Sequence, residues 1–145
     1  MHLEGKLFMD SDFIEKEKLR VKKLFAKKHQ LGFKSGTDLA DWFAKRIQEQ
    51  KFKCEYCRTS IFDIKKLIEK KMLKTRKTGY GERGLVLEID KKNNENGYTK
   101  DNCVLACYYC NNDKSYIFDY DEYKKCFGEN RKKFFTNLLK HDGTN

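Results

Sequence analysis

Residues 85–114 carry the pattern from which the architecture can be predicted: LVLEIDKKNNENGYTKDNCVLACYYCNNDK. The segment opens with an apolar, β-branched run, which predicts a strand that ends at Asp90. The polar run that follows contains Asn96-Gly97, a strong signal of a hairpin turn. Residues 103–106 then predict the returning strand, and a helix is expected to begin near Asn111. This order of strand, turn, strand and helix predicts an α+β core.

Two Cys-x-x-Cys pairs frame this core, and their members are Cys54, Cys57, Cys107 and Cys110. Each pair places two sulfurs about one Zn–S bond, roughly 2.3 Å, from a common point, and four thiolates complete a tetrahedral structural site. The sequence is less compatible with a redox-active cysteine pair, because neither pair follows a clear βαβ pattern. The N-terminal residues show no signal-peptide pattern, so a disulfide scaffold is not expected. We therefore predict a structural Zn²⁺ site with all four positions filled.

Helices are expected before the core. Apolar residues recur at helical spacing over residues 12–30 and 37–50, and we interpret both segments as a packed support for the rest of the chain. Ser60-x-x-Asp63 is expected to cap a third helix that runs to about Met72. The glycine-containing segment that follows this helix, around residues 78–84, is expected to be a flexible loop.

After the core, residues 120–140 predict a helical segment that is broken near Gly128. Cys103 and Cys126 stand outside the two pairs and are expected to pack as small apolar residues.

The charge of the chain favours a polyanion. The 145 residues include 32 basic and 22 acidic ones, which gives a formal net charge of +10. The excess is concentrated in residues 51–100, with 14 basic and 7 acidic side chains, whereas residues 101–145 carry 7 of each. DNA is the expected partner and RNA the alternative, although such a charge run is also typical of a solvated face. The candidate contacts are Lys70, Lys71, Lys74, Arg76, Lys77 and Arg83.

No run of about 18 apolar residues is present, so no membrane span is expected. With no targeting pattern either, we expect a cytoplasmic protein.

The order of residues from Leu87 to Lys114 resembles the HNH endonucleases, and within them the small members with two cysteine hooks. The shared order is strand, Asp, basic residue, Gly-Tyr turn, Asn, strand, Cys-x-x-Cys-Asn and Lys. The resemblance covers about residues 52–116. It implies a ββα-metal motif that holds one divalent cation and cuts phosphodiester bonds. It also implies a treble-clef fold, in which the cysteine hooks bind structural zinc.

The resemblance places roles on individual residues. It implies that Asp90 and Asn111 coordinate a catalytic Mg²⁺ or Mn²⁺, and that Asn102 orients the loop and the general base. One carboxylate and one amide oxygen form a sparse oxygen site suited to Mg²⁺. Glu88, two residues before Asp90 on the expected strand, faces the same side and is either a further metal ligand or a solvent-facing carboxylate. Lys114, one helical turn after Asn111, is expected to hold a phosphate or to be a solvated lysine.

One position departs from the family pattern, because the first His falls on Lys91. The histidines of this chain, His2, His29 and His141, lie far outside the motif in sequence. Three interpretations remain open: Lys91 is the general base, Tyr98 supplies a hydroxyl as base or nucleophile, or the site binds nucleic acid without cutting it. Relatives with two cysteine hooks often carry Arg or Lys here, so the substitution does not by itself indicate an inactive protein.

The function expected from the sequence is a metal-dependent HNH-type endonuclease of DNA, in a phage, mobile-element or anti-phage setting. The alternatives are a zinc-stapled nucleic-acid-binding module without catalysis, and a subunit whose protein partner supplies target recognition. The expected organisation of the single domain 1–145 is a helical N-terminal support (1–51), a zinc-stapled nuclease core (52–116) and a C-terminal helical segment (117–145).

Overall fold

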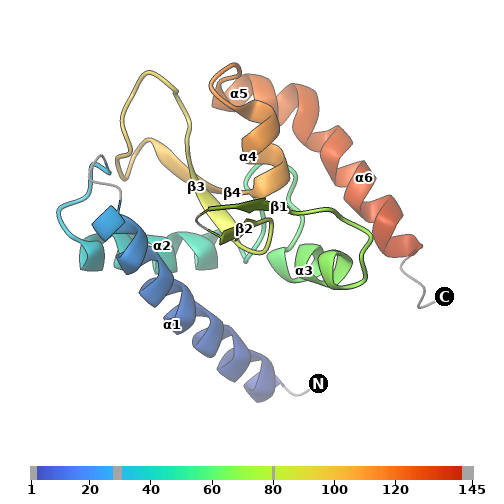
Figure 1. Cartoon of the computed structure of the whole chain (residues 1–145), viewed down its shortest axis with the longest axis horizontal. Coiled ribbons are helices and arrows are strands. Elements are labelled where there is room, and N and C mark those ends of the chain that lie inside the picture. The colour runs from blue at the N-terminus through green and yellow to red at the C-terminus, as the bar shows by residue number, and fades with distance from the viewer. Residues whose placement is uncertain (1–2, 28–30, 80, 142–145) are drawn as a thin grey trace.

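The computed structural model describes residues 3–27, 31–79 and 81–141, and within them it combines helices with two small antiparallel sheets (Figure 1). The mixed α+β class is therefore confirmed. The helices are α1 (Leu3–Lys27), α2 (Gly36–Glu49), α3 (Ile61–Glu69), α4 (Tyr108–Lys114), α5 (Tyr120–Tyr123), the π-helical turn η1 (Lys124–Gly128) and α6 (Glu129–Lys140). The strands are β1 (Arg76–Thr78), β2 (Gly81–Arg83), β3 (Leu87–Lys91) and β4 (Cys103–Cys107). No helix in this described part is long and apolar enough to cross a membrane.

The β3–β4 hairpin forms the centre of the molecule. Its strands are antiparallel, with Leu87 opposite Cys107, and β4 is buried along its whole length. The side-chain amide of Gln50, just after α2, accepts from the N–H of Leu105 (3.0 Å) and donates to its carbonyl (2.9 Å). The N–H of Glu55 donates to the same carbonyl at 2.9 Å. The turn that carries the first cysteine pair is thereby attached to β4.

The two N-terminal helices pack against each other and support β3 (Figure 1). Val21 of α1 and Leu39, Phe43 and Ile47 of α2 are fully buried, as expected of helices with one apolar stripe. Arg20 of α1 donates to the carbonyl of Leu87 at 3.3 Å, which fixes α1 to β3. The helix is longer than predicted at its start, because it begins at Leu3, and residues 28–30 of the predicted helix lie outside the described residues.

Two predicted helix boundaries are wrong. α3 ends at Glu69 and not near Met72, because Lys71 adopts a left-handed backbone conformation (φ 60°) that cannot continue the helix. The C-terminal segment is not broken at Gly128, because the chain passes through η1 directly into α6. A Cβ at Gly128 would lie 2.4 Å from the carbonyl oxygen of Tyr56, so the glycine there allows close packing on the first cysteine turn.

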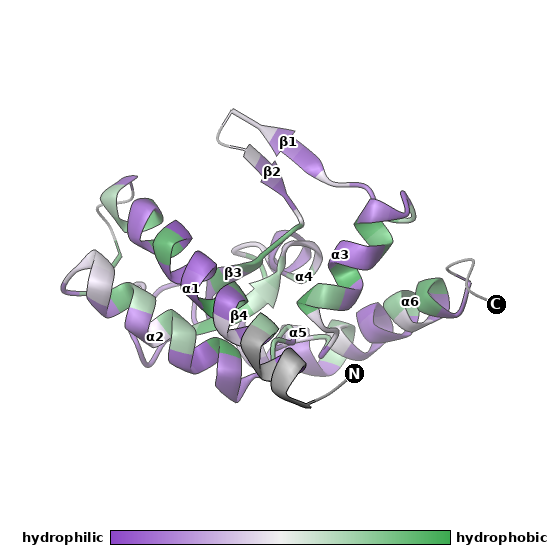
Figure 2. Cartoon of the chain, turned by 90° about the horizontal axis from the view of Figure 1, so that it is seen from below, coloured by the Kyte–Doolittle hydropathy of each residue, from purple (hydrophilic) through white to green (hydrophobic). Residues whose placement is uncertain are grey.

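The segment expected to be a flexible loop forms a second hairpin from β1 and β2. Arg76 pairs with Arg83 and Thr78 with Gly81, whose φ of 124° suits glycine, while Tyr80 of the predicted loop lies outside the described residues. Figure 2 shows this hairpin as a hydrophilic arm that stands out from the rest of the molecule. Its residues are almost entirely exposed, so it contributes little to the core.

Candidate functional site

The four cysteines of the two predicted pairs come together in the structure. Their sulfurs all lie within 4.8 Å of one another, and Cys54, Cys57, Cys107 and Cys110 are all buried. Sulfurs bound to one tetrahedral zinc at about 2.3 Å are separated by roughly 3.8 Å, so the cluster fits such an ion. Hydrogen bonds from the three neighbouring thiols hold the pKa of Cys57 well below its usual range, which favours a thiolate. We refer to these four residues as the cysteine cluster.

The second cysteine pair also starts α4. The sulfur of Cys107 accepts a hydrogen bond from the N–H of Cys110 at 3.4 Å, which caps the first turn of the helix. α4 therefore begins at Tyr108 and not near Asn111 as predicted. As a result, Asn111 lies in the second half of the first turn and faces β3, where its amide nitrogen donates to Glu88 at 2.8 Å.

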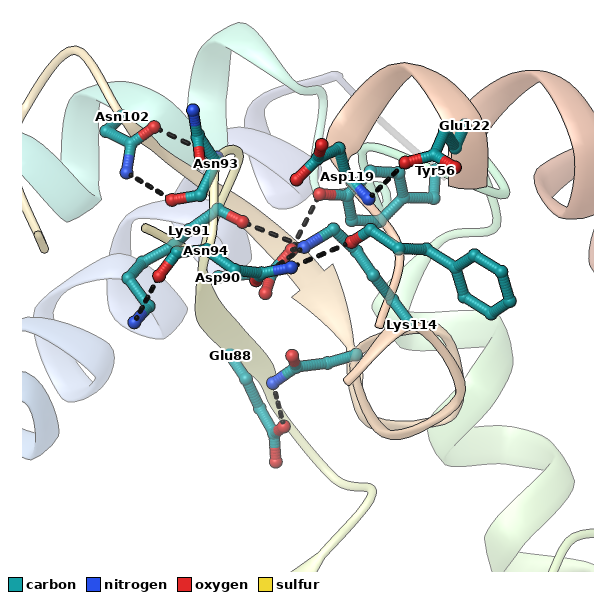
Figure 3. A network of polar contacts seen from close by, with 12 residues as sticks. Tyr56, Glu88, Asp90, Lys91, Asn93, Asn94, Asn102, Lys114, Asp119 and Glu122 are labelled. Carbon is teal, nitrogen blue, oxygen red and sulfur yellow. Dashed lines mark hydrogen bonds and ion pairs between the residues drawn. The ribbon is translucent and has the colours of Figure 1, made fainter. Parts of the chain in front are cut away.

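Asp90 is the last residue but one of β3 and is buried, with 6% of its surface exposed. The hydroxyl of Tyr56 donates to its Oδ2 at 2.6 Å, and the ammonium of Lys114 lies 3.3 Å from the same oxygen (Figure 3). Burial raises the pKa of Asp90, while the Tyr56 hydrogen bond and the Lys114 charge act in the opposite direction. The carboxylate is thus held by two donors from different elements.

Glu88 lies on the same face of β3 as Asp90, as the two-residue spacing predicts. Its Oε1 accepts from Asn111 and from Arg83 Nη2 (2.6 Å), and its Oε2 accepts from Arg83 Nε at 3.0 Å. The Arg83 guanidinium also lies over the ring of Tyr108, 4.6 Å from its centroid. Arg83 thereby connects the projecting hairpin to the face shared by β3 and α4.

The donor set on this face fits a hard divalent cation. It consists of two carboxylates and one amide, and oxygen ligands are what Mg²⁺ and Mn²⁺ prefer. Asp90 uses Oδ2 for Tyr56 and Lys114, and Asn111 uses its nitrogen for Glu88. Among the described side chains, none donates a hydrogen bond to the remaining oxygen, Oδ1, of Asp90 or of Asn111. These two oxygens therefore have no side-chain donor, and the backbone N–H of Lys91 also donates to the Asp90 carboxylate.

The two candidates for the base lie together, on the other side of β3. The Lys91 ammonium is 5.0 Å from the ring centroid of Tyr98 and 3.4 Å from the carbonyl of Asn94. Side chains alternate along a strand, so Lys91 points away from the Asp90 carboxylate (Figure 3). Burial, and after it the charge of Asp90, raise the pKa of Tyr98, which makes its hydroxyl harder to deprotonate.

Asn102 organises the loop between β3 and β4, residues 92–102. Its amide nitrogen donates to the carbonyls of Asn93 and Gly97, both at 3.0 Å, and its oxygen accepts from the N–H of Asn93 at 3.1 Å (Figure 3). Asn96-Gly97 lies within this loop, so the predicted hairpin is present and its connection consists of residues 92–102. The loop also touches the N-terminal part, because the N–H of Gly32 donates to the carbonyl of Tyr98 at 2.6 Å.

Lys114 differs from its predicted role. It has no exposed surface, and its ammonium donates to the carbonyl of Lys91 at 2.9 Å in addition to pairing with Asp90. The ammonium is engaged inside the protein, contrary to the expectation of a phosphate contact or of a solvated lysine. Of the histidines, His2 and His29 lie outside the described residues, and His141 directly follows α6.

The predicted nucleic-acid contacts follow one path from the end of α3 into the projecting hairpin. We call residues 70–83 the basic segment. Arg83 is partly buried against Glu88, whereas the other five candidates are exposed: Lys70, Lys71, Lys74, Arg76 and Lys77. Beside it, between the start of β1, α4 and α6, lies a hollow of about 330 Å³ whose lining includes Lys74, Tyr108 and Arg131. The segment thus offers positive charge next to the face that carries Glu88 and Asn111.

Two residues of this site were not predicted. Gln50 is buried and attaches the first cysteine turn to β4, and Tyr56 is buried against Asp90. The only sequence signal for Tyr56 is its place inside the first Cys-x-x-Cys pair, and nothing local indicates its contact 34 positions away.

No protein-family model matches the chain, and no curated protein matches it. Among solved structures, the chain is similar to the rare-cutting HNH restriction endonuclease PacI, which is described for its mechanism of DNA perturbation. The superposition has a TM-score of 0.61 with 23% sequence identity, and covers 85% of this chain and 80% of that one. At this level of identity the similarity shows a shared fold. The α+β architecture is therefore one that an HNH restriction endonuclease also has.

Proposed function

We propose that this chain is a metal-dependent endonuclease of the HNH type that hydrolyses phosphodiester bonds of DNA. In this proposal β3, β4 and α4 form the ββα-metal motif, and the cysteine cluster is the structural zinc site of a treble clef. The observation that carries the proposal is the placement of Glu88, Asp90 and Asn111 on one face of this unit. The fold shared with an HNH restriction endonuclease supports it.

The residues on this face divide the chemical tasks. Asp90 and Asn111 hold the cation, Glu88 is a further ligand only if it releases Arg83 or Asn111, and Lys114 favours the ionised form of Asp90 from the buried side. A bound Mg²⁺ or Mn²⁺ supplies stabilisation of the negative charge that develops on the phosphate and on the leaving 3′ oxygen. Asn102 fixes the loop that carries Tyr98. Lys91 and Tyr98, the two candidates for accepting a proton from water, lie on the other side of β3 from the Asp90 carboxylate, so we assign the general base to neither.

The DNA is held by its phosphates along the basic segment. Such contacts position the backbone and carry little sequence information. The Arg83 guanidinium is the innermost of these charges, because it already pairs with the Glu88 carboxylate. Charge contacts of this kind bring a strong dependence of binding on salt concentration.

The test is cleavage of supercoiled plasmid by the purified, zinc-loaded protein with Mg²⁺ or Mn²⁺. Asn111→Ala removes a cation ligand and leaves the buried Asp90–Lys114 pair intact, so it separates catalysis from folding. Loss of several kcal/mol of charge stabilisation predicts a rate at least about 100-fold lower. Asp101→Ala removes an exposed carboxylate from the end of the β3–β4 loop. It is the matched control and should cut like the wild type. Activity that survives Asn111→Ala and Asp90→Asn alike would refute the metal assignment.

One observation favours a second candidate, a nucleic-acid-binding module that does not cut. Asp90 is nearly buried and already forms an ion pair with Lys114. Among the described residues, no histidine contacts it. This candidate predicts salt-dependent DNA binding by the wild-type protein, no Mn²⁺ binding measurable by calorimetry, and no relaxed or linear plasmid product.

A further inference from the structure

Tyr56 connects the cysteine cluster to Asp90. It stands between Cys54 and Cys57 in the first Cys-x-x-Cys turn and is 3% exposed. Its hydroxyl donates to Asp90 Oδ2 at 2.6 Å, the one side-chain hydrogen bond to Asp90 from outside α4 in the described part of the chain. A residue of the first cysteine turn therefore contacts the carboxylate that the proposed function assigns to the cation.

The position of this hydroxyl is fixed from three sides. The ring packs against Tyr120 (centroids 5.6 Å apart, 55°) and edge-on against Tyr123 (5.2 Å, 82°). The main chain of Tyr56 touches Gly128, where only a glycine fits. Since the flanking cysteines belong to the cluster, metal binding there would also fix the backbone on both sides of Tyr56.

The hydrogen bond selects which oxygen of Asp90 remains available. Tyr56 and Lys114 both engage Oδ2, so the carboxylate cannot rotate without losing two contacts in a buried environment. Oδ1 is left on the side of Glu88 and Asn111. Tyr109 of α4, which is partly buried, instead donates to a main-chain carbonyl, that of Lys74, at 2.7 Å.

We propose that Tyr56 is a positioning residue for Asp90: its hydroxyl holds Oδ2 so that Oδ1 is presented to the divalent cation, and it links occupancy of the cysteine cluster to the geometry of the cation site. This inference rests on the proposed function. Removing a hydrogen-bonding partner of a metal ligand typically lowers metal affinity or activity 10- to 100-fold.

The test compares Tyr56→Phe with Tyr120→Phe. Both variants remove one hydroxyl from adjacent, mutually packed rings, but the Tyr120 hydroxyl donates to Glu55 (2.7 Å) and does not touch Asp90. We expect Tyr56→Phe to retain its zinc, to bind Mn²⁺ about 10- to 100-fold more weakly by calorimetry, and to lose kcat by a similar factor at unchanged KM for DNA. Tyr120→Phe should match the wild type in all of these measurements.

Two outcomes overturn the positioning role: a Tyr56→Phe protein with wild-type Mn²⁺ affinity and kcat, or equal losses in both variants. In either case the wild type still binds Mn²⁺ and cuts, so the proposed function stands. A wild type that neither binds Mn²⁺ nor cuts would remove the proposed function and this inference together.

A second measurement does not depend on the folding of a variant. In wild-type protein with isotope-labelled tyrosine rings, addition of Mg²⁺ should shift the Tyr56 signals and leave those of Tyr120 unchanged. Equal shifts, or none at Tyr56, contradict the inference.

Discussion

The molecule contains two short antiparallel hairpins that use charge in opposite ways. In β3–β4 the two carboxylates are paired, Asp90 with the buried Lys114 and Glu88 with Arg83. In β1–β2 the charged side chains are exposed apart from Arg83, which pairs with Glu88. Arg76 lies directly opposite Arg83, and Lys77 lies opposite Glu82. Like charges opposite each other destabilise a sheet and opposite charges stabilise it, so the charged cross-strand pairs of β1–β2 contribute little net stability. We infer that charge in β3–β4 maintains the fold and that charge in β1–β2 serves an anionic partner.

Loss of a cysteine ligand should produce the largest effect, and this effect should be on folding stability. Cys110→Ser removes one of the four sulfurs, and because binding energy at a structural zinc is folding energy, we expect loss of zinc and of cooperative thermal unfolding. Metal analysis by mass spectrometry and a melting curve measure both. Cys126→Ser, at an exposed cysteine outside the cluster, should change neither. Native wild-type protein that contains no zinc and melts like Cys110→Ser would remove the assignment of the cluster.

The buried pair should show the next largest effect. Lys114→Met keeps a side chain of similar length but leaves Asp90 buried without its cation, which typically costs about 3–5 kcal/mol in the free energy of unfolding. Denaturant unfolding measures this loss. Lys100→Met is the matched control, since the Lys100–Asp38 pair is shorter (2.7 Å against 3.3 Å) but Lys100 is 55% exposed. Burial, and not distance, should therefore decide the cost, and Lys100→Met should change stability only slightly.

A double variant sharpens this prediction. If the cost of Lys114→Met arises from the unpaired Asp90 carboxylate, then adding Asp90→Asn should recover a substantial part of the lost stability. Losses that simply add would attribute the cost to packing of the lysine stem instead.

These charge roles were only partly predictable. The cysteine cluster and the β3–β4–α4 order could be predicted because each depends on local spacing: two cysteines three residues apart, apolar strands and a polar connection. The β1–β2 hairpin could not, because its three-residue strands have no apolar face. The start of α4 was misplaced because the cap is a sulfur, that of Cys107, which ordinary capping patterns do not include.

The candidate site was predictable to the level of which residues share a face, and no further. Alternation along a strand places Glu88 with Asp90, and α4 brings Asn111 to them. The burial of Lys114 and the hydrogen bond from Tyr56 depend on how α4 and the first cysteine turn pack on β3, which no local pattern contains. The expectation that Lys114 contacts phosphate failed for this reason.

The basic segment should show no effect on folding and a clear effect on binding. Lys74→Ala, Arg76→Ala and Lys77→Ala together remove three exposed charges, and exposed substitutions of this kind usually leave stability within about 0.5 kcal/mol. If each charge contacts one phosphate, the slope of log K against log salt concentration for DNA binding should become shallower by about 2 to 3. Fluorescence anisotropy with labelled duplex at several salt concentrations measures the slope.

A second triple variant decides whether position or total charge matters. Lys125→Ala, Lys132→Ala and Lys133→Ala remove the same three charges from exposed positions on η1 and α6. Both variants therefore have the same net charge, so any non-specific attraction weakens equally. A shallower slope for the triple variant at Lys74, Arg76 and Lys77 alone assigns the phosphate contacts to the basic segment. Equal slopes would mean that the basic segment is a solvated face, and the two hairpins would then differ in burial but not in function.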